Sequence, residues 1–507
     1  MKRSSLITLV LAAIFILCPS SSVQSAAPKE LTYHSYDSLV ADLNQLAASY
    51  PSIAKVYQIG TSAEGRKILA IKVSDNASSD ANEHENRVLF VGTHHAREWI
   101  SLEVPYLLAR YLVEHYNDSG IKPLIDNEEI WIVPLLNPDG FEYTRTTDRL
   151  WRKNRHHIPI PFWPDCHGVD LNRNYGASTW GTIDDSANSR TCVDLLLGER
   201  DTYIGPNSFS ELETQAIRNL FQNNYIDAVL SYHSFSQLIL WPWGYTTSKI
   251  GNAADREFME NVAKDMRDRI KTVSNEAYIP EQSSSLYRTA GDLTDWTYET
   301  YGIPSFTIEL RPTSSNPGFV LPADQIDDTF NENLPAALRL LEAYRPSVNN
   351  PTETNPVNAG PYNNAKKIFV DISGVGKGRT KSDFGVKVGG RQGTVVSAVS
   401  TGVNRYTLGV MPPTQLANGI YSLEVTIGGS SATQSNAVSY ADVSNADVML
   451  VIDRSGSMDY SGYLEPAKTA AMQFVDFMQN GDKIGIVSFD QSSYVNFPLS
   501  TISGASC

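Results

Sequence analysis

The sequence predicts an α/β protein with a mixed central sheet flanked by helices, followed by a small all-β sandwich and an incomplete α/β segment. Three observations indicate this order. Strand and helix signals alternate over residues 31–344, short alternating segments broken by glycines occupy residues 365–442, and a further strand–helix–strand pattern follows residue 445. A chain of 507 residues is too long for one ordinary core, so several domains are expected.

The first region contains continuous apolar runs, which are typical of strands buried on both faces of a sheet covered by helices. The runs are ILAIKV (68–73), VLFVG (88–92), IWIVP (130–134), AVLSYH (228–233) and SFTIEL (305–310). Helical spacing predicts helices over residues 39–50 and 324–344. Ser210 and Glu213 form a capping-box pattern, which predicts a helix from there through Leu220.

Composition and charge restrict the class of protein. Apolar residues make up 41% of the chain and charged residues 19%, which indicates a globular protein rather than a disordered one. The formal net charge is −15, and no long Lys/Arg run interrupts the sequence. Nucleic acid is therefore not expected as a partner, because its phosphates require a basic surface.

Residues 1–27 have the layout of a cleaved secretory signal, with a basic start, an apolar run from Leu6 to Cys18 and a small-residue exit. The run is too short to favour a membrane span, and bulky Leu17 argues against a lipid anchor on Cys18. No later stretch is long and apolar enough to cross a bilayer. We therefore expect a secreted, extracellular protein without a membrane span.

Three cysteines follow the signal: Cys166, Cys192 and Cys507. An oxidising compartment favours a Cys166–Cys192 disulfide, which stabilises by roughly 3 kcal/mol in the entropic model. Two buried free thiols are the alternative. Cys507, the last residue, is left without a partner.

The composition changes after the first region. Residues 346–364 are rich in Pro, Asn and Thr and predict a linker. Residues 365–442 contain alternating segments such as KIFVDIS and YSLEVTI, which predict a small β-sandwich.

The last segment, residues 446–507, contains the stretch DVMLVIDRSGSM, residues 447–458, near its start. A buried strand is expected to lead to Asp453, Ser455 and Ser457, followed by a helix over residues 466–478 and the strand KIGIVSF. This pattern resembles the opening of a von Willebrand factor A domain, whose DxSxS loop supplies metal ligands. The family's later threonine and aspartate ligands have no counterpart here, and domains usually span about 100–150 residues. We therefore expect an incomplete sheet and an incomplete second metal site.

The stretch GTHHAREWIS, residues 92–101, places two histidines and a glutamate directly after an expected strand. Open α/β sheets form their sites at the carboxyl ends of strands. A histidine and a glutamate three residues apart can reach one ion, and His233, at the end of AVLSYH, is the obvious third ligand for a catalytic zinc. From spacing alone, a merely hydrogen-bonded His95–Glu98 pair is an equal alternative.

Six sequence blocks add to this pattern. They are HAREWIS, LNPDGFEYT, LWRKNR, DLNRNY, SYHSFSQLILWPWGY and SFTIEL. In this order, over about residues 31–345, they resemble the zinc metallocarboxypeptidases of the pancreatic carboxypeptidase A/B type, peptidase family M14. The resemblance implies the zinc carboxypeptidase fold over residues 28–345, one zinc ion, and hydrolysis of the C-terminal peptide bond of peptides and proteins.

The resemblance also implies the metal ligands. His95, rather than His94, matches the H-x-x-E ligand, and with Glu98 and His233 it would hold zinc. His94 is expected to support the site or to pack beside it. Glu309 matches the general base that activates the zinc-bound water.

Further matches concern the substrate. Arg152 matches the arginine that polarises the scissile carbonyl, while Lys153 and Arg155 are expected to be solvated. Asn172 and Arg173 match the clamp for the terminal carboxylate, which a guanidinium can bind through two parallel hydrogen bonds.

Tyr287 matches the mobile tyrosine that closes over that carboxylate. Arg97 is either a subsite contact or an ordinary surface arginine. In the family a disulfide flanks the DLNRNY block, and Cys166 and Cys192 match it.

In the family that the sequence resembles, the residue before the Asp-Trp pair lies in the pocket for the departing side chain. The resemblance therefore implies a specificity pocket at Thr294, which is small and neutral, with Asp292 two residues earlier. We expect a broad pocket that prefers hydrophobic C-terminal residues and accepts basic ones.

Two other functions compete with this interpretation. A cell-wall endopeptidase of the same superfamily is not expected to keep Asn172, Arg173 and Tyr287 together. An adhesive protein would have no reason to retain the metal ligands and the general base. We expect a monomer that acts on peptide or protein C-termini, with surface or matrix contact through the C-terminal modules.

Overall fold

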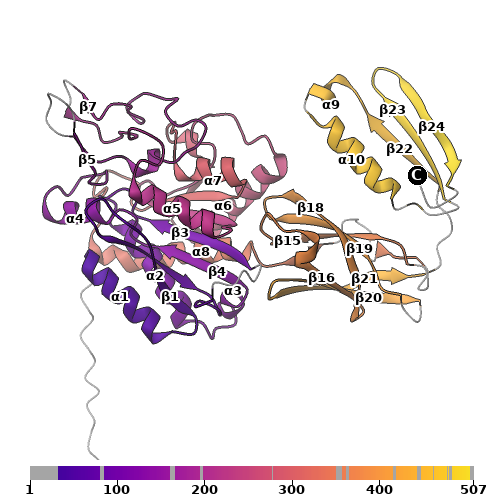
Figure 1. Cartoon of the computed structure of the whole chain (residues 1–507), viewed down its shortest axis with the longest axis horizontal. Helices are drawn as coiled ribbons and strands as arrows, with labels where there is room; N and C mark the ends of the chain where they lie inside the picture. The colour runs from indigo at the N-terminus through magenta and orange to yellow at the C-terminus, as the bar shows by residue number, and fades with distance from the viewer. Residues whose placement is uncertain are drawn as a thin grey trace, which may run out of the picture.

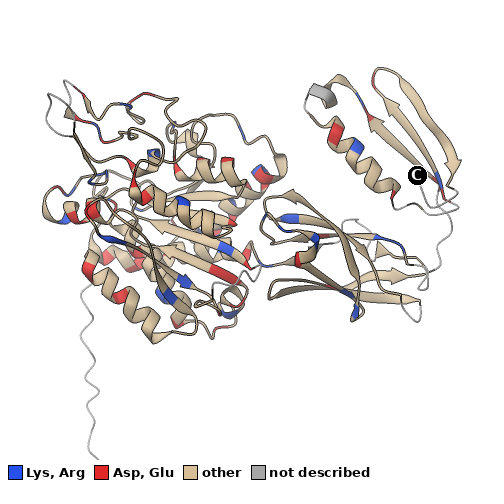
Figure 2. Ribbon diagram, viewed as in Figure 1, with Lys and Arg blue, Asp and Glu red and all other residues tan. Residues whose placement is uncertain are grey.

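The computed structural model of the chain describes residues 32–502, apart from 80–84, 160–165, 195–197, 277, 350–356, 361–364, 415–417, 442–446, 461, 477 and 479–481. The predicted signal, residues 1–27, and Cys507 lie outside the described residues. Three units follow one another along the chain: an N-terminal α/β domain, a β-sandwich and a C-terminal segment (Figure 1). Acidic and basic residues are interspersed over all three (Figure 2).

The N-terminal α/β domain is built on an eight-stranded mixed sheet with the order β1-β2-β4-β3-β9-β12-β10-β11. Its strands are β1 (Ala54–Thr61), β2 (Lys67–Val73), β3 (Asn86–Gly92), β4 (Glu128–Val133), β9 (Ala228–Ser234), β10 (Leu238–Trp241), β11 (Ile279–Gln282) and β12 (Ser305–Leu310). The neighbours β4, β3, β9 and β12 run parallel, whereas β1 and β2 are antiparallel. The five apolar runs form β2, β3, β4, β9 and β12, which confirms the predicted sheet.

Helices cover both faces of this sheet. They are α1 (Tyr36–Ser49), α2 (Ile100–Glu114), α3 (Lys122–Ile125), α4 (Pro138–Thr146), α5 (Leu212–Asn223), α6 (Ala253–Ser274), α7 (Leu293–Tyr301) and α8 (Ile326–Glu342). Side chains of α1, α2, α6 and α8 pack on one face, and those of α5 and α7 pack on the other. In β3, Val88 and Phe90 join the first core while Leu89 and Val91 join the second. This two-sided burial explains why the strand is a continuous apolar run.

The capping-box prediction was wrong. Helix α5 begins at Leu212, and its N-cap residue Glu211 makes no side-chain capping bond. The Ser210 hydroxyl donates to the Glu211 carboxylate, and the Asn154 amide donates to both Glu211 and Glu213. The two carboxylates at the helix start therefore join a buried polar cluster with Asn154 and do not form a capping box.

The β-sandwich consists of two sheets with the orders β13-β15-β19-β18 and β14-β21-β20-β16-β17. Its strands are β13 (Ser347–Asn349), β14 (Val357–Asn358), β15 (Ile368–Ser373), β16 (Phe384–Val388), β17 (Arg391–Gln392), β18 (Thr394–Gly402), β19 (Arg405–Met411), β20 (Gly419–Ile427) and β21 (Ser430–Tyr440). The all-β character was predicted. Strands β13 and β14, however, come from the stretch predicted as a linker, so this stretch contributes to both sheets.

The C-terminal segment has a three-stranded sheet with the order β22-β23-β24. Its elements are β22 (Asp447–Asp453), α9 (Gly456–Tyr460), α10 (Leu464–Val475), β23 (Lys483–Phe489) and β24 (Ser493–Thr501). The prediction of a buried strand was wrong for β22, because Val451 is 63% exposed. No residue of α10 is buried, so this helix does not cover the sheet fully. The helix also lies about two residues earlier than predicted.

The N-terminal α/β domain and the sandwich meet at the amino ends of two central strands. Asn86, which opens β3, donates to the carbonyls of Tyr344 (2.6 Å) and Gly374 (2.9 Å) and accepts from the Gly376 amide (2.9 Å). These bonds join buried backbone groups of both units through one side chain.

A buried carboxylate reinforces this joint. Asp227, just before β9, forms an ion pair with Arg379 of the sandwich (3.3 Å) and accepts from the Arg87 amide (2.9 Å). Burial raises the pKa of Asp227 to about 6, although Arg379 and Arg87 oppose the rise.

Across the described residues, no helix combines the length and apolarity needed to cross a bilayer.

Candidate active site

Two neighbouring strands carry the candidate metal ligands. His95 and Glu98 lie in the loop between β3 and α2, and His233 lies in β9, which pairs in parallel with β3. The loop turns sharply at Gly92, where a Cβ atom would stand 2.0 Å from the Ser101 carbonyl oxygen. Only glycine allows this close approach of the two backbone segments.

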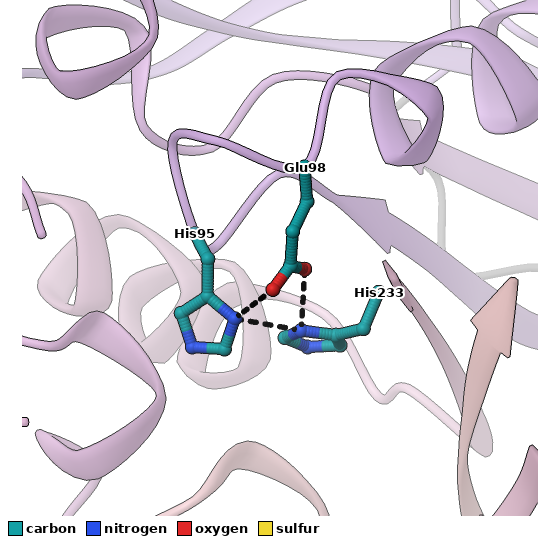
Figure 3. Close-up of side chains that lie close together, drawn as sticks. All are labelled: His95, Glu98 and His233. Atoms are coloured by element: carbon teal, nitrogen blue, oxygen red, sulfur yellow. Dashed lines mark hydrogen bonds and ion pairs between the residues drawn. The ribbon is translucent and has the colours of Figure 1, made fainter. Parts of the chain in front are cut away.

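The three side chains converge on one point (Figure 3). His95 Nδ1 lies 2.8 Å from Glu98 Oε1, His233 Nδ1 lies 3.1 Å from Glu98 Oε2, and the two Nδ1 atoms are 3.1 Å apart. Tetrahedral zinc with ligands at about 2.0–2.1 Å separates its ligand atoms by about 3.3 Å, so this donor set fits the metal. All three residues are at most 3% exposed.

The histidines also set the charge of the carboxylate. Burial alone raises the pKa of Glu98, but the neighbouring His95 and His233 lower it below the usual range. The site therefore holds an ionised carboxylate beside two imidazoles, which is the form that binds a metal.

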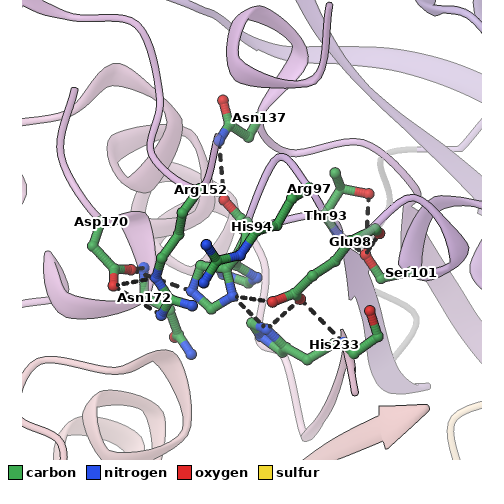
Figure 4. A network of polar contacts seen from close by, with 12 residues as sticks. Thr93, His94, Arg97, Glu98, Ser101, Asn137, Arg152, Asp170, Asn172 and His233 are labelled. Carbon is green, nitrogen blue, oxygen red and sulfur yellow. Dashed lines mark hydrogen bonds and ion pairs between the residues drawn. The ribbon is translucent and has the colours of Figure 1, made fainter. Parts of the chain in front are cut away.

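Asp170 completes the support of His95, and the sequence analysis missed it. Its Oδ1 lies 3.2 Å from His95 Nε2. Its Oδ2 accepts from Arg152 Nε at 2.9 Å, a pair that Figure 4 shows. Burial opposes ionisation of Asp170, but Arg152, Arg173 and His95 together hold its pKa well below the usual range. Asp170 is the first residue of DLNRNY, so its place next to the clamp residues was the available signal.

Glu309 lies beside the metal ligands because of strand register. Its strand, β12, pairs in parallel with β9, and Glu309 is the direct partner of His233. Burial raises the pKa of Glu309 to about 7, while His233 opposes the rise.

The predicted clamp residues lie on the short 3₁₀ turn Leu171–Arg173. Arg173 is 1% exposed; its Nε donates to the Ala187 carbonyl (2.8 Å), and its Nη2 has no partner among the described residues. The Tyr287 ring lies 5.6 Å from the Arg173 guanidinium and is 42% exposed.

One cavity joins the candidate metal site, the clamp and the predicted specificity residues. It is lined by His95, Asn172, Arg173, His233, Leu240, Ser283, Leu286, Tyr287, Thr289, Asp292, Thr294, Thr307 and Glu309. Asp292 is also the N-cap of α7 and accepts hydrogen bonds from the Asp295 amide and from the hydroxyls of Thr289 and Thr294.

Arg97 lies outside this lining. Its guanidinium stacks 4.2 Å from the Phe319 ring and pairs with Asp201 at 3.2 Å. The expectation that Lys153 and Arg155 are solvated was wrong for Lys153, which is 1% exposed with its ammonium 3.5 Å from Glu199. The Arg155 guanidinium stacks on the ring of Tyr143 at 3.8 Å.

The structure contains the Cys166–Cys192 disulfide, with Cα atoms 6.2 Å apart, so the alternative of two free thiols does not hold.

In the C-terminal segment, the predicted loop residues share one turn. The Ser455 amide donates to Asp453 (2.8 Å), and the hydroxyls of Ser455 and Ser457 are 2.9 Å apart.

A family model described as zinc carboxypeptidase matches residues 39–336. The chain belongs to the zinc carboxypeptidase family. Consistent with the His–Glu–His set, its cofactor is one zinc ion, and the chain is a metallocarboxypeptidase. A second model, von Willebrand factor type A domain, matches residues 448–506 and confirms the resemblance of the C-terminal segment.

Relatives of known sequence support this assignment. Carboxypeptidase B from Astacus astacus is 33% identical over 307 residues, covering 59% of this chain and 93% of that protein. A zinc carboxypeptidase from Simulium vittatum is 32% identical over 316 residues, covering 62% and 97%.

Solved structures support the fold. Bovine thrombin-activatable fibrinolysis inhibitor, in complex with tick carboxypeptidase inhibitor, is 29% identical with a TM-score of 0.53, covering 61% of this chain and 97% of that chain. Carboxypeptidase A from Helicoverpa armigera is also 29% identical, with a TM-score of 0.52, covering 61% and 73%.

Proposed function

We propose that this zinc carboxypeptidase is a secreted exopeptidase that removes C-terminal residues by Glu309-assisted attack of water. The observation that carries the proposal is the position of Arg173. Arg173 lines the same cavity as Glu309 and His233, and its buried Nη2 has no hydrogen-bond partner among the described residues. A free terminal carboxylate can occupy this guanidinium, whereas an internal peptide bond cannot offer two parallel acceptors.

We assign the other roles from geometry and from the family resemblance. His95, Glu98 and His233 hold the zinc, and Asp170 orients His95 through its second nitrogen. Zinc, when bound, acts as a Lewis acid that lowers the pKa of a water molecule towards ~7.

Glu309 takes a proton from the attacking water and later gives it to the departing amine. Its raised pKa of about 7 suits a base that must also release the proton. Arg152, held by Asp170, stabilises the oxyanion that develops on the scissile carbonyl.

Asn172 and Arg173 bind the terminal carboxylate, and the exposed Tyr287 closes over it. Arg97 contacts a residue further along the substrate. The cell-wall endopeptidase and adhesive functions do not account for a guanidinium placed in this cavity.

Specificity rests on the pocket at the start of α7. The neutral Thr294, Thr307 and Leu240 favour hydrophobic C-terminal side chains, and the buried carboxylate of Asp292 allows basic ones. Asn caps a helix as well as Asp does, so Asp292→Asn removes the charge while keeping the cap.

The proposal also covers export of the protein, its division into domains and its oligomeric state. Residues 1–27 act as a signal peptide for export, and residues 28–345 form the catalytic domain. Residues 365–442 form the sandwich together with β13 and β14 from the stretch 346–364. Residues 446–507 form the A-like segment, with Asp453, Ser455 and Ser457 as a candidate second metal site. The protein is a monomer whose C-terminal modules contact a surface or matrix.

The test follows amino-acid release from blocked peptides ending in Phe, Leu, Lys or Glu. We expect single C-terminal residues to be released, with loss of activity on chelation and recovery with zinc. Asp292→Asn is expected to reduce Lys release at least 10-fold and to leave Phe release within about 2-fold. No release by zinc-loaded protein from any of the four peptides contradicts the exopeptidase proposal.

A further inference from the structure

The two histidine ligands are supported differently. Nε2 of His95 meets the Asp170 carboxylate at 3.2 Å. Among the residues that the structure describes, none forms a hydrogen bond with Nε2 of His233. Ligand histidines almost always have such a partner on the second nitrogen, which fixes the ring plane. The orientation of His233 must therefore come from another contact.

That contact is His94, the residue next to the ligand His95. The rings of His94 and His233 are stacked, with centroids 5.3 Å apart and planes inclined by 18°. His95, by contrast, meets His233 at an interplanar angle of 58°. Of these two histidines, His94 is therefore the one whose ring lies nearly parallel to the ring of His233. His94 is fully buried.

His94 is itself held in place from two sides. Its Nε2 is hydrogen-bonded to the Tyr175 hydroxyl at 2.8 Å, and its Nδ1 lies 3.4 Å from the Ser231 hydroxyl. The Tyr175 ring stacks on Trp296 of α7, with centroids 5.5 Å apart and planes inclined by 25°. Both Tyr175 and Trp296 belong to the core between the sheet and helices α5 and α7. The imidazole of His94 thus connects a metal ligand to the packed interior.

We propose that His94 is a positioning residue: it sets the ring plane of His233 by stacking, and Tyr175 fixes His94 through its hydroxyl. This inference rests on the proposed assignment of His233 as a zinc ligand. It gives the first histidine of the HH pair a function that the ligand pattern alone does not require.

The chain offers a closely matched set of variants. Tyr175→Phe removes only the hydroxyl that holds His94, and His94→Phe keeps an aromatic face but cannot form the same bond. Tyr232→Phe is the control. Tyr232 directly precedes His233, and its buried hydroxyl has no hydrogen-bond partner among the described residues. The substitution therefore removes a buried tyrosine hydroxyl without breaking a described hydrogen bond.

The readouts are the zinc dissociation constant, measured by chelator competition, and the visible spectrum of the Co²⁺-substituted full chain. We expect Tyr175→Phe and His94→Phe each to weaken zinc binding about 10-fold and to change the Co²⁺ spectrum. The double variant is expected to match the weaker single variant, because both changes remove the same hydrogen bond. Tyr232→Phe is expected to bind zinc within 2-fold of the wild type.

Two results overturn the inference. If the wild type binds zinc and both Tyr175→Phe and His94→Phe bind it equally well with an unchanged Co²⁺ spectrum, His94 does not position His233, and the proposed function stands. If the wild type binds neither zinc nor Co²⁺, the ligand assignment and this inference fail together.

Discussion

The sandwich meets its two neighbours in different ways. Toward the N-terminal α/β domain, buried Asn86 and Asp227 bind backbone and side-chain groups of both units. Toward the C-terminal segment, Lys367 pairs with Asp476 at 3.2 Å, and the two side chains are 22% and 62% exposed. Exposed ion pairs stabilise by only about 0–1 kcal/mol. Buried contacts therefore hold the sandwich to the N-terminal α/β domain more strongly than the exposed Lys367–Asp476 pair holds it to the C-terminal segment.

The largest expected effect comes from breaking the buried joint at Asn86. Asn86→Leu leaves two carbonyls and one amide of the joint without their partner, and each unmet buried group costs about 1–3 kcal/mol. We expect the free energy of unfolding of the full chain to fall by roughly 3–5 kcal/mol in chemical denaturation. Asn44→Leu, at an exposed position of α1, is the control. Equal stability of these two variants contradicts the importance of the joint.

A second prediction uses the pH dependence of the same joint. Asp227 has a folded pKa of about 6, above the ordinary value of 3.8, so the folded state holds its proton more tightly than the unfolded state. Stability from this group is therefore present in full below pH 4 and declines as pH rises to about 6, by up to about 3 kcal/mol.

Asp227→Asn is expected to remove this decline in urea titrations run from pH 4 to 7. Asp118→Asn, at a side chain that is 60% exposed, should retain it. A wild-type slope that survives in Asp227→Asn assigns the effect to another group and refutes this account.

The smallest expected effects come from valine substitutions in the sandwich and in the C-terminal segment. Val425, in β20 of the sandwich, is fully buried, whereas Val451 in β22 is 63% exposed. Val425→Ala is expected to destabilise by about 2 kcal/mol and Val451→Ala by less than about 0.5 kcal/mol. Thermal denaturation of both variants checks this difference, and a larger loss for Val451→Ala shows that β22 is covered more fully than described.

The same pair of strands shows how far sequence predicts structure. VLFVG and DVMLVI both read as buried strands, and both form parallel strands. Only β3 is buried, because helices cover both faces of its sheet. An apolar run predicts a strand, but burial depends on elements that lie far away in the sequence.

The candidate site divides in the same way. Residues in sequence blocks, such as His95, His233 and Arg173, could be located from the sequence, and the structure brings them into one cavity. The partners that come from packing could not be located. Neither the contact between His94 and Tyr175 nor the use of Asn86 as a joint has a spacing that a single sequence reveals. Glu213 was misassigned because a capping pattern is local, whereas its partner Asn154 is distant.

The central strands β3 and β9 contact the sandwich at one end and the candidate metal site at the other. Strands β3 and β9 begin at the sandwich and lead, at or just beyond their other ends, to the metal ligands. The appended sandwich is thus joined to the ends of these strands that lie opposite the candidate metal ligands. A molecule immobilised on a filament, a bead or an envelope through its sandwich would hold the candidate metal site on the side away from the support.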